Sequence, residues 1–230
     1  MMKRLFLCMA ALAVITIQIQ GQRFLDTSAP SQFFTVGARV GINTSNCSFP
    51  TTPSTLYNNN SWGTGFDAGV IANLNIREYL SIQPGLFFES RSGNYSYLYW
   101  YYDFKEDYQE YWDMGHQRSY NFTIPVMAIV KFKIMDKFKP MAEFGPYFQY
   151  TLKHNGDGIV VPYQVPQTTT FSTFVAKHNN FDFGFKMGIG LQFFDHYYFG
   201  VHYLAGASNS WKEPQGGKNK EWSFTIGYDF

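Results

Sequence analysis

The last ten residues, EWSFTIGYDF (residues 221–230), decide the fold because polar and apolar side chains alternate through them without a break. One face carries every apolar side chain: Trp222, Phe224, Ile226, Tyr228 and Phe230. Side chains of a strand point alternately to its two faces. The segment therefore predicts a strand that lies between an apolar and a polar environment.

The same alternation recurs in seven other segments, which predicts strands along the whole chain. The eight segments are 33–43, 62–76, 80–91, 119–133, 141–153, 181–193, 196–207 and 221–230. Short connections alternate with four long ones, at about 44–61, 92–118, 154–180 and 208–220. Outer-membrane barrels have this rhythm, with short periplasmic turns and long extracellular loops.

The distribution of charge separates a lipid-facing strand from a strand of a water-soluble sheet. Roughly 50 positions fall in the apolar class of the eight segments, and none of them is Asp, Glu, Lys or Arg. With 15% charged residues in the chain, about seven would be expected there by chance. A charge that faces lipid at mid-bilayer costs about 2–4 kcal/mol, so a membrane barrel excludes it. The sequence therefore predicts an all-β, eight-stranded antiparallel up-and-down transmembrane barrel over residues 33–230, in preference to a secreted soluble β-sandwich.

The first 21 residues have the layout of a secretion signal, with a basic pair before a short apolar run. We expect residues 1–21 to be removed and residues 22–32 to form an N-terminal periplasmic segment. The remaining 209 or so residues suit one domain. They contain Cys47 as their single cysteine, which excludes an internal disulfide. A net charge of +1 gives no argument for nucleic-acid binding.

Charged residues gather in the polar class of the strands, and six are acidic and six basic: Arg39, Asp67, Glu89, Arg91, Lys131, Lys133, Glu143, Lys153, Asp182, Lys186, Glu221 and Asp229. The lumen of an eight-stranded barrel is only wide enough for side chains to fill. We therefore expect a plugged lumen with an ion network of Arg39, Asp67, Glu89, Arg91, Lys131, Glu143, Asp182 and Lys186. Lys133 and Lys153 fall near strand ends and are expected in solvent. Glu221, also near a strand end, is expected either in solvent or, like Asp229, facing inward or toward the ends of the lumen. His202 is expected to be a hydrogen-bonded lumen residue.

Three prolines lie inside strand segments, and each removes one donor from the strand ladder. They are Pro84, Pro125 and Pro146. We expect local bulges at these positions.

The predicted loop 92–118 has dense aromatic residues on both sides of a charged tip at 105–107. This predicts a hairpin that extends the third and fourth strands above the membrane. Tyr and Trp give large contact areas at low entropic cost, so the hairpin is the candidate surface for an extracellular protein or glycan. Its residues are Tyr97, Tyr99, Trp100, Tyr101, Tyr102, Phe104, Tyr108, Tyr111 and Trp112. The alternative is an aromatic collar that folds over the barrel mouth or contacts lipopolysaccharide.

No group of side chains predicts catalysis, a metal site or a bound cofactor. His116, His154 and His178 lie in predicted extracellular loops, where chemistry on outer-leaflet lipid would occur. No Ser, His and acid share a catalytic spacing, GxSxG is absent, and no ligands cluster at metal spacing. We therefore predict a protein that is not an enzyme.

Several short motifs mark strands and turns: VGARVGIN (36–43), GFDAG (65–69), LSIQPGL (80–86), IP (124–125), FGPY (144–147), FDFG (181–184) and GIG (188–190). Together they resemble the PorT-like group of Gram-negative outer-membrane β-barrel proteins over roughly residues 30–230. The resemblance implies an eight-stranded barrel in the outer membrane. Some proteins of this group are associated with secretion machinery, and no motif here carries that role over.

The leading hypothesis is a non-enzymatic outer-membrane barrel with a plugged lumen, whose extracellular loops bind a partner or cap the barrel. Its rivals are a narrow permeation or transport protein, a component of secretion machinery and a lipid-modifying enzyme. Expected partners are outer-membrane lipid and lipopolysaccharide, an extracellular protein or glycan, and the barrel-insertion machinery, which would recognise the C-terminal aromatic Phe230.

Overall fold

The computed structural model describes residues 24–48, 55–102, 108–134, 137–162, 177–213 and 217–230. For residues 55–59, 95–102, 108–114, 156–162, 177–178 and 211–213 it describes the backbone alone. The expected secretion signal, residues 1–21, lies outside the described residues. Among the described residues, no helix is long and apolar enough to cross a membrane.

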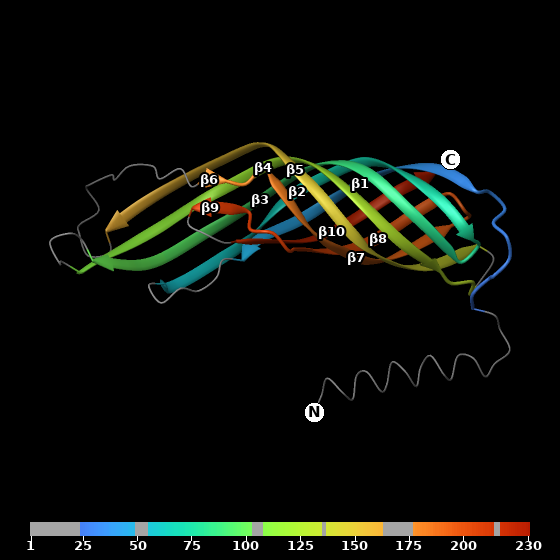
Figure 1. Cartoon of the computed structure of the whole chain (residues 1–230), viewed down its shortest axis with the longest axis horizontal. Helices are drawn as coiled ribbons and strands as arrows, with labels where there is room; N and C mark the ends of the chain where they lie inside the picture. The colour runs from blue at the N-terminus through green and yellow to red at the C-terminus, as the bar shows by residue number, and fades with distance from the viewer. Residues whose placement is uncertain (1–23, 49–54, 103–107, 135–136, 163–176, 214–216) are drawn as a thin grey trace, which may run out of the picture.

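Eight antiparallel strands close into one barrel, which confirms the predicted fold class (Figure 1). The order around the wall is β1-β10-β8-β7-β5-β4-β3-β2, so the first barrel strand pairs with the last. The barrel strands are β1 (Phe34–Ser48), β2 (Thr55–Arg77), β3 (Leu80–Tyr102), β4 (Tyr108–Lys131), β5 (Phe138–Pro162), β7 (Phe181–Phe193), β8 (Tyr197–Gly206) and β10 (Lys218–Asp229). Two short strands, β6 (Lys177–His178) and β9 (Trp211–Glu213), form a separate sheet.

The closing strand β10 shows how side chains are sorted between the two faces of the wall. Trp222 and Ile226 are 44% and 58% exposed on the outside, whereas Glu221 and Ser223 are each 1% exposed on the inside. Apolar residues outside and polar residues inside reverse the usual arrangement of a water-soluble protein. An outer band that faces lipid has this arrangement, and closure of the barrel leaves no unpaired strand edge in the membrane.

Four neighbouring strands are much longer than the others. β2, β3, β4 and β5 have 23, 23, 24 and 25 residues, whereas β1, β7, β8 and β10 have 15, 13, 10 and 12. Their additional residues project past the barrel wall as a four-stranded sheet (Figure 1, left). This outer sheet consists of residues 55–62, 94–102, 108–116 and 152–162. We term this end of the barrel the long-loop end and the opposite end the short-turn end.

The strands extend further at the long-loop end than the sequence pattern predicted. Residues 44–48, 55–61 and 154–162, predicted as loops, are strands, and residues 92–102 and 108–118 pair as the predicted hairpin that extends β3 and β4. The alternation of apolar and polar residues marks only the part of a strand that contacts lipid. Beyond the lipid, a strand surrounded by water needs no apolar face, so the pattern that located the strands ends before the strands do.

The three strand prolines do not produce the expected bulges. Between β3 and β4, pairing runs to Pro84↔Val126 and resumes in the same register at Phe87↔Thr123. A proline removes a ladder donor, and here the result is a short gap in the ladder rather than an inserted residue. Unbroken register also flanks the other two strand prolines, Pro125 and Pro146.

Residues 24–33 cross the short-turn end of the barrel, and we term this segment the strap. The backbone oxygen of Phe24 accepts a hydrogen bond from the Lys133 N–H at 2.8 Å. At the other end of the strap, the oxygen of Phe33 accepts from the Asn75 N–H, also at 2.8 Å. The strap is therefore attached both to β2 and to the segment that follows β4.

Candidate functional site

The candidate binding surface lies on the hairpin of β3 and β4. Backbone pairing continues to Tyr102↔Tyr108 and places Tyr99 opposite Tyr111. Five of the predicted surface residues lie on β3 and three on β4: Tyr97, Tyr99, Trp100, Tyr101, Tyr102, Tyr108, Tyr111 and Trp112. Phe104 lies outside the described residues, and the other side chains lie outside the described atoms. The structure thus gathers these backbone positions in one projecting hairpin.

The outer sheet has two edges that no described strand covers. The pairing of β1 with β2 ends at Gly63, and the pairing of β5 with β7 ends at Tyr150. Hydrogen bonds from the side-chain amides of Asn46 and Asn60 to the backbone oxygens of Asn60 and Cys47 extend the first of these seams by a short distance. In the described part of the chain, residues 55–59 of β2 and 152–162 of β5 have no strand on their outer side.

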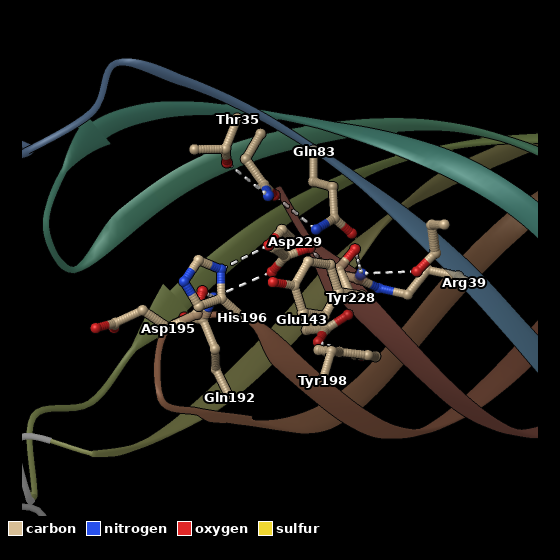
Figure 2. A network of polar contacts seen from close by, with 12 residues as sticks. Thr35, Arg39, Gln83, Glu143, Gln192, Asp195, His196, Tyr198, Tyr228 and Asp229 are labelled. Carbon is tan, nitrogen blue, oxygen red and sulfur yellow. Dashed lines mark hydrogen bonds and ion pairs between the residues drawn. The ribbon is translucent and has the colours of Figure 1, made fainter.

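Inside the barrel, an ion pair joins β1 to the closing strand β10. Arg39 Nη2 lies 2.6 Å from Asp229 Oδ1, and both side chains are buried. Gln192 Nε2 donates to the other carboxylate oxygen, Asp229 Oδ2, at 3.0 Å. Arg39 also stacks over the Tyr198 ring, with its Cζ 4.2 Å from the ring centre. Figure 2 shows these groups, with His196, gathered around Asp229, so the barrel seam is held from the inside.

A second cluster links β5 to β8 across the intervening β7. The Tyr198 hydroxyl donates to Glu143 Oε1 at 2.7 Å. His202 Nε2 lies 3.0 Å from Glu143 Oε2, and all three side chains are buried. His202 is therefore a hydrogen-bonded interior residue, as the sequence predicted.

A third cluster is centred on Arg91 and joins β3 to β10. Arg91 Nη2 lies 2.8 Å from Glu89 Oε2, and Arg91 Nε lies 2.5 Å from Glu221 Oε2. The Thr123 hydroxyl donates to Glu89 Oε2 at 2.7 Å. One guanidinium thus serves two carboxylates that lie on different sides of the barrel interior.

A fourth cluster surrounds Asp182. The Tyr147 hydroxyl donates to Asp182 Oδ2 at 2.9 Å, and Asn219 Nδ2 donates to the same oxygen at 2.8 Å. The Ser208 hydroxyl donates to Asp182 Oδ1. The sequence pattern places Tyr147 in the same parity class as Glu143, and this parity was the one signal that could have assigned Tyr147 to the interior.

The residues predicted for the interior ion network differ in what they contact. Arg39, Glu89 and Arg91 lie in ion pairs, and Glu143 and Asp182 accept hydrogen bonds. Asp67 and Lys186 are 3% and 5% exposed but form no ion pair with another described residue. Lys186 instead lies over the Phe87 ring, with its Nζ 5.3 Å from the ring centre. Lys131 is half-buried near the short-turn end.

The expectation that Glu221 lies in solvent is wrong. Its side chain is fully buried because Arg91 reaches across the interior to pair with it. Lys133 and Lys153 are exposed, as predicted, although Lys153 lies within β5 rather than at its end. Sequence position showed that Glu221 starts the last predicted strand, but β10 begins earlier, at Lys218, which places Glu221 inside the barrel.

Two small cavities lie within the interior. One of about 30 Å³ is lined by residues that include Ser45, Arg91 and Gln149. The other, of about 20 Å³, is lined by residues that include Phe87 and Lys186. A water molecule needs roughly 10–15 Å³ measured in this way, so each cavity accommodates only one to three waters.

The histidines considered for lipid chemistry are not assembled into one site. Strand register places His116 opposite Asp157 and His154 opposite Ser119. His178 lies on β6, and its side chain is outside the described atoms. Within the described residues, no group of three or more His, Cys, Asp or Glu side chains is arranged to hold a metal ion.

A model of the family "Outer membrane protein beta-barrel domain" matches residues 20–212. The chain belongs to this family. The protein is therefore located in the outer membrane, in contact with its lipids, and the predicted location is confirmed. This agrees with the apolar outer face of the barrel wall.

Several solved outer-membrane structures are similar to the chain at low sequence identity. Ail, the attachment invasion locus protein of Yersinia pestis, in complex with the heparin analogue sucrose octasulfate, is 13% identical with a TM-score of 0.41, over 86% of this chain and 100% of that chain. Neisserial surface protein A is 11% identical with a TM-score of 0.42, over 86% and 98%. OprG from Pseudomonas aeruginosa is 11% identical with a TM-score of 0.45, over 90% and 99%. No curated protein matches the sequence.

Proposed function

We propose that this protein is a non-enzymatic binding protein of the outer membrane, with a plugged lumen and an outer sheet that binds an extracellular partner. The observation that carries this proposal is the projection of β2–β5 beyond the rest of the wall. Residues 152–162 of β5 alone extend roughly 35 Å at about 3.3 Å per residue. A barrel that only crossed the membrane would not need this length.

The orientation follows from the lengths of the connections. In outer-membrane barrels the short turns face the periplasm and the long connections face the outside. The strap and the C-terminal end of β10 lie together at the short-turn end (Figure 1). We therefore assign the short-turn end to the periplasm and the outer sheet to the cell exterior.

Two features of the outer sheet support binding of a protein segment. Among the described residues, no strand pairs with the outer side of residues 55–59 or 155–162, so a partner could add a further strand there. The β3–β4 hairpin adds a high density of Tyr and Trp, which are enriched at binding interfaces. A glycan could use the aromatic residues but not the strand edges, so the edges favour a protein partner.

A plugged lumen is supported by the contacts inside the barrel. The buried clusters of Arg39, Glu143, Arg91 and Asp182 cross the interior, and the two interior cavities measure about 30 and 20 Å³. Planar-bilayer recording tests this part of the proposal. We expect no reproducible conductance steps from the purified protein, and such steps would favour the permeation alternative.

Three finer assignments are part of the same proposal. The motifs of the sequence favour a PorT-like member of the family, although they carry no secretion role. Phe230, which is exposed at the short-turn end, is proposed to contact the barrel-insertion machinery, and outer-leaflet lipopolysaccharide is proposed to surround the long-loop end. If deletion of Phe230 left the rate of insertion unchanged, that role would be removed.

The binding proposal is tested by removing the projecting hairpin while keeping the barrel. Residues 96–114 are replaced by a two-residue Asn-Gly turn, which suits a β-hairpin and keeps Tyr95 opposite Gly115. Wild type and variant are then compared on an array of extended peptides and an array of glycans. We expect peptide binding that the variant loses while its heat-modifiable migration on gels is retained. Glycan binding without peptide binding would overturn the strand-addition mode, and no binding by wild type on either array would count against the function.

A further inference from the structure

A cavity of about 420 Å³ opens at the short-turn end of the barrel. Its walls come from the strap, from the ends of β2, β4 and β5, and from the turn between β7 and β8. A second cavity of about 280 Å³ lies beside it, and Glu78, Lys131 and Lys139 line both. We term the two cavities together the vestibule. Small-molecule sites typically measure about 300–1,000 Å³, so the vestibule has the size of a ligand site.

Of the four carboxylate side chains that line the vestibule, three are in ion pairs, and the fourth, Glu78, accepts a hydrogen bond from a backbone N–H. The strap supplies the backbone N–H of Ser31, which donates to Glu78, and the strap's own Asp26 pairs with Lys133. The contacts are Asp229 with Arg39 at 2.6 Å, Asp195 with Lys139 at 2.6 Å, Asp26 with Lys133 at 3.1 Å, and Glu78 with the backbone N–H of Ser31 at 2.5 Å.

Two of the basic side chains in the vestibule, Lys131 and Arg77, form no ion pair with a described carboxylate. Lys131 is half-buried, and its Nζ contacts only the amide oxygen of Asn75, at 3.3 Å, among the described residues. Arg77 also lines the larger cavity and forms no ion pair with a described residue. Neither side chain is in ion-pair contact with a described carboxylate, so each has N–H donors left for a ligand that enters the vestibule.

The inner wall of the vestibule is closed by the cluster around Asp229. Gln192 Nε2 donates to both Asp229 Oδ2, at 3.0 Å, and the backbone oxygen of Asp195, at 2.9 Å. Both carboxylate oxygens of Asp229 are therefore occupied by donors, as Figure 2 shows for Gln192 and Arg39. A ligand that enters from the short-turn end would meet Lys131 and Arg77 before it reached this wall.

We propose that the vestibule binds a small organic anion with a carboxylate or phosphate group, held by Lys131 and Arg77. The planar guanidinium of Arg77 can donate two parallel hydrogen bonds to either group, and Lys131 supplies a point charge deeper in the cavity. Lys139 lines both cavities and adds a third positive charge while it remains paired with Asp195. This site lies at the opposite end of the barrel from the outer sheet and does not depend on the function proposed above.

Isothermal titration calorimetry on the full-length mature protein in nanodiscs, at constant ionic strength, tests the proposal. Citrate and inorganic phosphate are used as separate probes, because their relative affinities distinguish a carboxylate ligand from a phosphate ligand. We expect saturable one-to-one binding of at least one probe. Lys131→Gln and Arg77→Gln should each weaken it at least tenfold, and Lys131→Arg should retain it because the charge is kept.

The matched control is Lys137→Gln, because Lys137 lies in the neighbouring turn, is exposed and does not line either cavity. This variant should bind the probe with unchanged affinity. The absence of saturable binding to both probes would overturn the proposal. An equal loss of affinity in the Lys137→Gln control would also overturn it, since that result indicates general charge attraction rather than a site. Arg77→Gln alters an exposed side chain, so it keeps the test decisive if Lys131→Gln does not fold.

Discussion

Replacing Arg91 with methionine is the most informative single perturbation of the interior. Arg91 is buried and forms ion pairs with Glu89 at 2.8 Å and with Glu221 at 2.5 Å. Methionine has a similar length but no charge, so the variant leaves two buried carboxylates without their shared partner. The contact between β3 and the closing strand β10 is lost at the same time.

The expected loss of stability can be estimated from the burial of these groups. Breaking a buried ion pair by removing one partner costs about 3–5 kcal/mol, because a buried charge is left uncompensated. Arg91 also lines the interior cavity of about 30 Å³, where one or two waters can hydrate the carboxylates. That hydration lowers the cost toward about 3 kcal/mol, which is more than a hundredfold in the unfolding equilibrium constant.

Guanidinium-induced unfolding of the protein in detergent micelles measures this loss. The triple variant E89Q/R91M/E221Q removes the two orphaned charges as well and should recover more than half of the lost stability. Lys153→Met, on an exposed lysine of β5, serves as the control and should change stability by less than about 0.5 kcal/mol. A loss below about 1 kcal/mol for Arg91→Met would refute the view that this cluster holds the interior together.

Three other perturbations follow from the structure. Gly145→Ala should lower the free energy of unfolding in denaturant by about 1–3 kcal/mol, because the new Cβ would collide with the backbone oxygen of Val126. Gly93→Ala should be neutral, because the nearest atom to its Cβ lies at 3.6 Å. Equal effects of the two variants would contradict the packing. Ile226→Arg, on the lipid face of β10, should cost up to about 2–4 kcal/mol while Ile226→Leu is tolerated, and a tolerated arginine would mean that this face does not contact lipid. The pKa of Asp26 is lowered from 3.8 to about 2 by hydrogen bonds from the Ser28 hydroxyl and N–H and by the Lys133 ammonium. These contacts therefore stabilise the strap above pH 3.8, where Asp26 is ionised. The contribution is lost as the pH falls through about 2. Pepsin should therefore cleave the strap of Asp26→Asn faster than wild type at pH 4 but equally fast below pH 2, and equal rates at both pH values would exclude the linkage.

The membrane-crossing part of the fold could be predicted from the sequence because lipid imposes a strict rule on each strand. Trp222 and Ile226 are outside and Glu221 and Ser223 inside, in the alternation that the sequence shows. The outer sheet could not be bounded in the same way. A strand beyond the lipid needs no apolar face, so no alternation marks where these strands end.

The interior contacts could be predicted as a class but not as pairs. Parity assigns Arg91 and Glu221 to the inside, but their contact joins residues 130 positions apart and depends on the register of every strand between them. The prolines show the same limit. A missing N–H signals a disturbed ladder, and only the structure shows that the ladder opens a gap without a shift of register.

The central claim is that β2–β5 carry a sheet outside the cell while the short-turn end faces the periplasm. Labelling of single cysteines on intact cells with a membrane-impermeant maleimide tests it most directly, with Cys47→Ser as the background. Tyr101→Cys, in the outer sheet, should be labelled on intact cells, and Lys137→Cys, in the short turn, should be labelled only after the outer membrane is permeabilised. Labelling of Lys137→Cys alone on intact cells, or of neither position before permeabilisation, would contradict the account.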